Sequence, residues 1–433
     1  MALIPCRQSK LALRWDESNL FDKLCDELVG EILVRLPTTT AVRFQAVCKR
    51  WNSLISSPYF IARFRHLRHQ HTESSSLVFR FAYSCDVSCI SDGCNQCQYS
   101  HFQIISNSNS SNSLLGKVYG ESAFRLSYLP CSPKDLQTLR FEGSFDDLIL
   151  FSCINLNNTN TYKVDYYISN LLTRQWIALP PVAYEDVYVS TGFLCVPPPV
   201  DTSHHHKFMV VRLCSGNYAY TPRSRFKAQV FSSENWQWRT LVVSSPLTLE
   251  QHIGGISLVA YRGMLHWLNG DCIVVYDPLN TPERFSRIIH LPTQLRTFDI
   301  FKYNCFEVSL GCLRVTGVLS ENAVNPDPVL DVWELEDYDS GLWNLVYKVR
   351  LKNLIHNGLL GSVQCELCYL LVISFHPENG DVIYLRLRTG VVSINMKSGI
   401  IERLYPIDMA MLCWADAFHL VDQWWPTALS LLY

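Results

Sequence analysis

The sequence predicts two units of different fold class, a small all-α bundle near the amino end and an all-β, propeller-like domain of about six blades after it. Apolar residues recur at intervals of three and four between Leu24 and Phe64, a spacing typical of amphipathic helices. Most of the later chain consists of short alternating segments separated by turn residues, a pattern typical of strands. Hydrophobic residues make up 48% of the 433 residues and charged residues only 18%, so we expect a folded protein with a large interior.

The length and these patterns predict a series of segments. They are a flexible tail (1–19), a helical domain (20–62), a basic linker (63–76), a β-domain (77–415) that contains a Cys-, Ser- and Asn-rich insertion (85–115), and a C-terminal segment (416–433). The 37 basic and 39 acidic residues give a net charge of −2, which supplies no positive field for non-specific binding of nucleic acid.

The sequence predicts neither a secretory signal nor a membrane anchor. The first residues lack a continuous apolar core, and Asp16 and Glu17 come early. The apolar run Leu367–Phe375 is too short to cross a bilayer and predicts a buried strand instead. We therefore expect the protein in the cytoplasm, the nucleus or both, where its 17 cysteines would act mostly as small buried apolar residues.

The first predicted helix runs from Leu24 to Leu36 and carries its apolar residues on one face. These residues are Leu24, Leu28, Ile32, Leu33 and Leu36. Asp26 and Glu27 lie in the first turn, where negative charge stabilises the positive end of the helix dipole. Pro37 lacks a backbone N–H and therefore ends the helix.

A second helix is predicted after the threonines at 38–40, whose hydroxyls can cap it. Its apolar face consists of Phe44, Val47, Cys48, Trp51 and Leu54. Ser56-Ser57-Pro58 interrupts the pattern, and a last short helical piece begins at Tyr59. A unit of about 45 residues buries too little of its own surface to be stable alone. We therefore expect it to dock on the rest of its own chain or on another protein.

This stretch resembles the F-box of plant F-box proteins, whose pattern combines an Ile-Leu-x-Arg-Leu-Pro segment with a Val-Cys-Lys-x-Trp segment. The matching residues are Asp26, Glu27, Leu28, Ile32, Leu33, Arg35, Leu36, Pro37, Arg43, Phe44, Val47, Cys48, Lys49, Trp51, Leu54 and Ile55. Cys25 stands where the family usually has proline, and Ala41 stands where it usually has leucine. Both positions touch the adaptor subunit in the family.

The resemblance implies a substrate receptor of a ubiquitin ligase, with the F-box bound to a Skp-family adaptor and, through it, to a cullin scaffold. The predicted adaptor face and its support are Leu24, Leu28, Ile32, Leu36, Pro37, Val47, Cys48, Trp51 and Leu54. The β-domain would then recruit an unknown target protein for ubiquitination and proteasomal degradation. The alternative function is a non-degradative scaffold that binds a Skp-like adaptor, and the alternative for the helices is an ordinary cap on a larger domain.

The insertion concentrates thiol and imidazole side chains, which are ligands that tetrahedral zinc prefers. The candidate zinc ligands are Cys85, Cys89, Cys94, Cys97 and His101. Cys94 and Cys97 form a Cys-x-x-Cys pair, but the earlier spacings are irregular and no apolar core is built into the loop. We therefore predict a surface insertion without metal and treat zinc as the alternative, with no cofactor expected elsewhere.

The β-domain repeats a pair of strands followed by a tryptophan or aliphatic residue shortly before Leu or Leu-Pro, every fifty to sixty residues or so. The tryptophans at 176, 238, 267, 333 and 343 are predicted core residues of the blades. Such a period is close to that of four-stranded propeller blades, and an irregular β-sandwich is the alternative. The region also resembles the F-box-associated domain of plant F-box proteins in Tyr166–Pro181, Val230–Trp238 and Gly263–Trp267.

We find no pattern of catalytic residues in the sequence. A Gly-x-Ser-x-Gly elbow, a phosphate-binding Gly-rich loop before a helix and a His-Glu-x-x-His motif are all missing. We therefore predict a protein without catalytic activity of its own, and a propeller enzyme that acts on a small molecule is the rival class.

Overall fold

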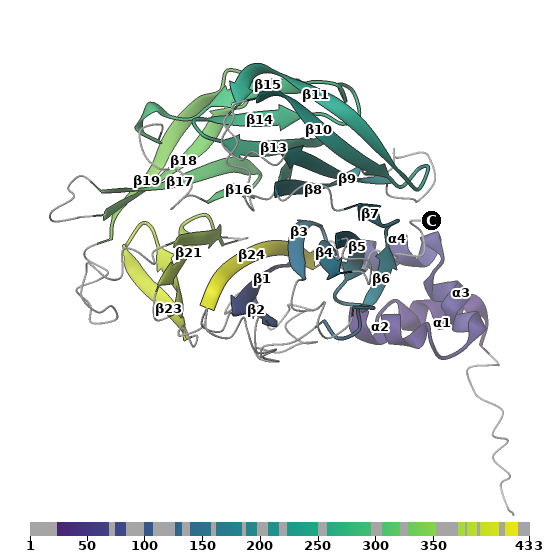
Figure 1. The fold of residues 1–433 in the computed structure, drawn as a ribbon. Coiled ribbons are helices and arrows are strands. Elements are labelled where there is room, and N and C mark those ends of the chain that lie inside the picture. The colour runs from purple at the N-terminus through teal and green to yellow at the C-terminus, as the bar shows by residue number, and fades with distance from the viewer. Residues whose placement is uncertain are drawn as a thin grey trace, which may run out of the picture. The chain divides into compact units, whose positions relative to one another are not determined.

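The computed structural model describes most of the helices and strands of the chain. The described residues are 24–68, 74–83, 99–106, 126–131, 139–156, 162–183, 188–196, 207–215, 223–249, 258–295, 305–320, 328–351, 371–376, 379–387, 390–406 and 412–422. Internal contacts divide the chain after Thr72, within the predicted linker, into a helical unit and a β unit. Both units are coloured by residue number in Figure 1, and each is described by itself below.

The helical unit consists of four short helices, one more than the sequence predicted. They are α1 (Asp26–Leu33), α2 (Thr38–Phe44), α3 (Lys49–Ile55) and α4 (Pro58–Arg68). Asp26 and Glu27 lie in the first turn of α1, as predicted. The Ser57 hydroxyl accepts a hydrogen bond from the Phe60 N–H (3.2 Å), and Pro58 occupies the first position of α4, where a missing N–H costs nothing.

The predicted second helix is in fact two helices, α2 and α3, because the chain turns at residues 45–47. Cys48 caps α3, with its sulfur accepting a hydrogen bond from the Trp51 N–H (3.4 Å). The threonines at 38–40 lie inside α2 and do not cap it, because Pro37 occupies the cap position and makes no side-chain bond. The helix α4 continues to Arg68 and so includes residues that the sequence assigned to the linker.

The β unit contains five complete blades, each a meander of antiparallel strands (Figure 1). Blade 1 comprises β3 (Arg140–Phe145), β4 (Leu148–Leu156), β5 (Tyr162–Asn170) and β6 (Gln175–Ala178), with β7 (Val182–Ala183) paired to β5. Blade 2 comprises β8 (Tyr188–Val196), β9 (Lys207–Ser215), β10 (Arg223–Ser232) and β11 (Gln237–Leu249). Blade 3 comprises β12 (Val259–Tyr261), β13 (Met264–Asn269), β14 (Cys272–Tyr276) and β15 (Phe285–His290), followed by the 3-10 turn η4 (Thr293–Leu295).

Blades 4 and 5 repeat the same order of strands. Blade 4 comprises β16 (Phe306–Ser309), β17 (Cys312–Ser320), β18 (Pro328–Asp337) and β19 (Leu342–Arg350). Blade 5 comprises β20 (Leu371–Phe375), β21 (Val382–Leu387), β22 (Gly390–Asn395) and β23 (Ile400–Pro406). Gly270, in the turn between β13 and β14, and Gly399, in the turn between β22 and β23, have φ of +56° and +65°, a conformation that glycine adopts at little cost.

A three-stranded sheet, the closing sheet, joins the two ends of the β unit. It contains β1 (Ser74–Tyr83), β2 (Tyr99–Ser106) and β24 (Leu412–Asp422), with β1 in the centre. The first strands of successive blades pack side by side from β3 to β20, and β24 packs against both β20 and β3. The ring is thus closed as a propeller, which excludes the alternative sandwich, but it has five complete blades where the sequence predicted about six.

The predicted insertion (85–115) and the predicted domain limit at 415 therefore both fall within the closing sheet. The strand β2 lies inside the predicted insertion, and β24 crosses the predicted start of the C-terminal segment. Locally, β24 follows the ordinary alternation of a strand, but its partner β1 lies more than three hundred residues earlier in the chain, as the pairing Val78–Phe418 shows. A pairing of this kind leaves no local sign in the sequence.

The core of the propeller lies between neighbouring sheets. Blades 1 and 2, 2 and 3, 3 and 4, and 4 and 5 each share one cluster of buried apolar side chains, and another joins the closing sheet to blade 1. Two predicted tryptophans act as ties between blades. The indole Nε1 of Trp238 donates to the Pro180 carbonyl (2.7 Å), and that of Trp343 donates to the His290 carbonyl (2.9 Å). Trp267 and Trp333 are buried as predicted, whereas Trp176 is exposed.

Candidate functional site: an exposed apolar face on the helical unit

The helical unit exposes a group of large apolar side chains. Leu28 and Ile32 lie one turn apart on α1 and are 52% and 44% exposed, and Val47, in the turn before α3, is 58% exposed. Pro37 and Cys48 are exposed as well. We call these five residues the docking face. Exposed apolar groups of this size are costly to leave in water, and they usually mark a surface that another molecule covers.

The other predicted adaptor residues are less exposed than the docking face. Leu24, Leu36, Trp51 and Leu54 are half-buried. The ring of Trp51 packs at 5.2 Å from that of Phe44, which fixes α2 against α3. The nine residues predicted as adaptor-binding are therefore divided between exposed positions and half-buried positions, and none of them belongs to the sealed core of the unit.

The sealed core uses a second stripe of α1 that the sequence analysis did not separate from the first. Its residues are Val29, Leu33, Val34, Ala41, Ile55, Phe60 and Phe64. Leu33 was predicted on the same face as Leu28 and Ile32, but it is buried while those two are exposed. Ala41 is completely buried, so the substitution for the family's leucine changes the packing of this unit. Val29 and Leu33 are also four residues apart, which was the available signal.

Ion pairs between charged side chains link the helices of this unit. Arg50 on α3 donates to the Asp26 carboxylate (2.8 Å) and to the Leu24 carbonyl at the start of α1. Glu31 on α1 pairs with Arg35 (2.6 Å) and with Arg63 of α4 (3.4 Å). The hydrogen bond from Arg35 lowers the pKa of the Glu31 carboxyl. Exposed ion pairs add little stability, so their main effect here is to orient α1.

The candidate zinc ligands Cys85, Cys89, Cys94 and Cys97 lie outside the described residues. His101 lies in β2, where its backbone pairs with Phe81 of β1. The structure therefore does not test the zinc hypothesis, which stays an alternative to a surface insertion without metal.

A polar cluster on the inner strands of the propeller resembles a catalytic triad only in composition. It joins Glu307 of β16, Ser374 of β20 and His419 of β24. The Ser374 hydroxyl lies 3.0 Å from His419 Nε2, and a Glu307 oxygen lies 3.2 Å from the same nitrogen. In a triad the acid binds the other ring nitrogen, and the nucleophile is accessible, whereas Ser374 is fully buried. The cluster therefore ties three inner strands together and does not present a nucleophile.

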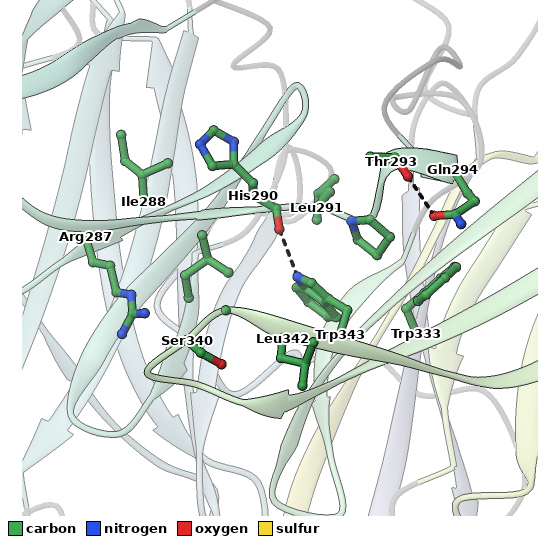
Figure 2. Close-up of a pocket in the computed structure, with 13 residues that line it drawn as sticks. Arg287, Ile288, His290, Leu291, Thr293, Gln294, Trp333, Ser340, Leu342 and Trp343 are labelled. Atoms are coloured by element: carbon green, nitrogen blue, oxygen red, sulfur yellow. Dashed lines mark hydrogen bonds between the residues drawn. The ribbon is translucent and has the colours of Figure 1, made fainter.

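The propeller also has an open pocket of about 390 Å³ between blade 3 and blade 4. Figure 2 shows its lining, which comes from residues 287–294, from Trp333 and from the β18–β19 hairpin at residues 340–343. The hydrogen bond from Trp343 to the His290 carbonyl crosses from one wall to the other. Sequence analysis missed this pocket because its walls belong to different blades. The local feature that could have indicated the pocket was Trp343, at the start of β19, whose indole reaches the preceding blade.

Among the helices of the described residues, none is long and apolar enough to span a membrane.

Helices with an exposed apolar face, joined to a closed ring of β-sheets, define an F-box protein with a β-propeller. An F-box domain matches residues 21–63. The family described as F-box protein At3g26010-like, beta-propeller, matches residues 126–404, well over half of the chain, and the chain belongs to this family.

Relatives from Arabidopsis thaliana share this organisation. The F-box/kelch-repeat protein At1g15680 is 27% identical over 87% of this chain and 82% of its own length. The F-box protein At5g49610 is 25% identical over 88% of this chain and 91% of its own. Among solved structures, the β-propeller domain of the Trilobed protease from Pyrococcus furiosus covers 62% of this chain and 72% of that one, at 9% identity and a TM-score of 0.31. That structural likeness is too low to support a functional argument.

Proposed function

We propose that this protein is the substrate-receptor subunit of a Skp–cullin–F-box ubiquitin ligase. F-box proteins with propeller domains generally serve in this way. The docking face would bind the Skp-family adaptor, and the propeller would hold the target protein near the ubiquitin-charged enzyme. Tethering of this kind accelerates transfer by raising the effective concentration of the target, so the receptor needs no catalytic group of its own.

The observation that carries this proposal is the exposure of Leu28, Ile32 and Val47 on a unit that already has its own core. Such a face gains free energy when a second polypeptide covers it. The family matches name an F-box and a propeller and no catalytic activity, which supports a role in binding. The proposal includes action in the cytoplasm, the nucleus or both, because proteasomal degradation takes place there.

The test is capture of a recombinant Skp-family adaptor by the full chain. Aspartate at both Leu28 and Ile32 would bury two charges in the interface, so we expect binding at least about a hundredfold weaker than that of the original chain. The matched control is Leu67→Asp, which changes an equally large and exposed leucine on α4 outside the docking face. Circular dichroism verifies that all variants fold. Undiminished capture by the double variant would overturn the proposal.

A second experiment separates the degradative role from the scaffold alternative. Affinity purification with and without residues 20–62 identifies proteins that bind the propeller. The abundance of these proteins is then measured with and without a proteasome inhibitor. A target of a ligase receptor rises in abundance when the proteasome is inhibited, whereas the partner of a scaffold does not change.

A further inference from the structure

The pocket between blades 3 and 4 has the size and lining of a site for peptide side chains (Figure 2). Its volume of about 390 Å³ falls in the range of ligand sites and accommodates one or two side chains. The tryptophans Trp333 and Trp343, with Ile288 and Pro292, give it an apolar wall. Leu342, which also lines the pocket, is 55% exposed. An apolar side chain from another molecule would therefore be buried here against aromatic surface.

The pocket is formed before any ligand binds. The Trp343 indole donates to the His290 carbonyl (2.9 Å), so the blade 4 hairpin is fixed to the edge of blade 3. The hairpin turns at Gly341, whose φ is +71°. A β-carbon there would lie 3.6 Å from Ile289, which shows how closely the turn approaches blade 3. Because these walls are already ordered, binding would not have to offset the entropy of ordering them.

The charge at the mouth of the pocket favours an acidic group. Arg287 is the one permanently charged residue among the described residues that line it. Its guanidinium lies 5.1 Å from the Tyr338 ring centre, and that of Arg262 lies 4.7 Å from the same ring. The Tyr338 hydroxyl is fixed by His266 Nε2 (2.8 Å). Arg287 also donates to the Asp339 backbone carbonyl. The Asp339 carboxylate faces Arg287 at 3.5 Å but is 88% exposed, so solvent screens that ion pair.

The backbone on both sides of the pocket suits an extended chain. The walls include β15 and β19, which are the last strands of their sheets. An edge strand leaves alternate backbone N–H and C=O groups free of ladder partners, and an extended peptide can pair with them. Pairing along the backbone combined with pockets for side chains is a recurrent mode of peptide recognition.

We propose that this pocket binds an extended segment of the target protein that carries an apolar side chain next to an acidic one. The apolar side chain enters between Trp333 and Trp343, and the acidic group pairs with Arg287. This inference rests on the proposed function, since it identifies the part of the propeller that holds the target.

The test uses three fluorescein-labelled peptides and the full-length protein. The first peptide is Ser-Gly-Leu-Asp-Gly-Ser, and the other two replace its leucine with alanine or its aspartate with lysine. Fluorescence anisotropy gives the dissociation constant of each. We expect the Leu-Asp peptide to bind at least about tenfold more tightly than either of the others, because each replacement removes one anchor. Leu342→Glu and Arg287→Gln are expected to abolish this preference.

The matched control is Leu279→Glu, which changes a leucine of similar exposure in blade 3 outside the pocket. It is expected to keep the preference of the original chain. Equal binding or no binding of all three peptides, or an unchanged preference in both pocket variants, would overturn the inference. Adaptor capture is measured on the same samples. If the original chain captures the adaptor but shows no peptide preference, only this inference is refuted. If the original chain shows the preference but fails to capture the adaptor, only the proposed function is refuted.

Discussion

The helical unit and the β unit handle apolar surface in opposite ways. The four helices bury one stripe of α1 and leave the neighbouring stripe, with Leu28 and Ile32, in water. The propeller buries most of its large apolar side chains between sheets, and Trp267 at 1% exposure is typical. A unit of some 45 residues cannot cover all of its apolar surface, whereas a closed ring can. The proposed adaptor site is accordingly a broad apolar face, whereas the proposed target site is a local pocket.

The strongest way to test this contrast is to remove a core side chain from the propeller. Trp267 packs edge-on against Phe226 at 5.7 Å inside the cluster shared by blades 2 and 3. Trp267→Ala is expected to lower the free energy of unfolding of the β unit by about 3–5 kcal/mol, because it leaves a large cavity. Chemical denaturation followed by circular dichroism measures this change.

The same variant is expected to capture the adaptor normally wherever it remains folded, because the docking face belongs to the other unit. Leu279→Glu serves as the control for a substitution in blade 3 that leaves the core intact. A loss of adaptor binding that exceeds the unfolded fraction would show that the two units do not act separately.

The pH dependence of stability gives a second, smaller test of the propeller interior. Burial lowers the pKa of His266 to about 4, whereas an unfolded histidine titrates near 6.5. Between these values the unfolded chain binds a proton that the folded chain excludes. The contribution of neutral His266 to the free energy of unfolding is therefore complete above about pH 6.5, and it is lost as the pH falls toward 4. The full difference between the two pKa values corresponds to a loss of about 3 kcal/mol in the free energy of unfolding.

The measurement compares the free energy of unfolding of the original chain and of His266→Gln at several pH values between 7 and 4.5 or so. Other groups titrate equally in both proteins, so the difference between the two curves isolates His266. We expect the variant to have the shallower loss of stability in acid. Parallel curves would mean that His266 does not remain neutral in the folded propeller.

Features that depend on a few neighbouring residues, such as turns, were predicted better from the sequence than contacts between residues far apart in the chain. The Ser56–Pro58 segment ends a helix where expected, and Gly270 and Gly399 lie in tight turns, because these effects depend on one or two residues. The first helix, α1, ends at Leu33, three residues before the predicted end at Leu36, and Pro37 occupies the cap position of α2 instead. The choice between the two apolar stripes of α1 was missed, since both have helical spacing and only their burial in the folded unit distinguishes them. The strand partners that close the ring, and the pocket between two blades, depend on residues far apart in the chain.

Trp51 is involved both in the packing of the helices and in the predicted adaptor face. Its substitution is the test with the smallest expected change in stability. The ring of Trp51 is half-buried against Phe44, so it contributes to the packing of α2 on α3, and it is also one of the predicted adaptor-binding residues. Full burial would predict a loss of about 3–5 kcal/mol for Trp51→Ala, whereas half-burial predicts about 1–2 kcal/mol. Unfolding of the helices, followed by circular dichroism, measures this loss.

Adaptor capture by Trp51→Ala and Trp51→Phe distinguishes direct contact of Trp51 with the adaptor from a purely structural role in the helical unit. Trp51→Phe keeps a ring against Phe44 and is expected to retain most of the stability. If Trp51 only supports the docking face, capture falls in proportion to the unfolded fraction in both variants. If its exposed edge also contacts the adaptor, Trp51→Ala weakens capture beyond that fraction. Stability unchanged in Trp51→Ala would contradict its place in the packing, and the docking face would then depend on the ion pairs of Arg50 and Glu31 for its shape.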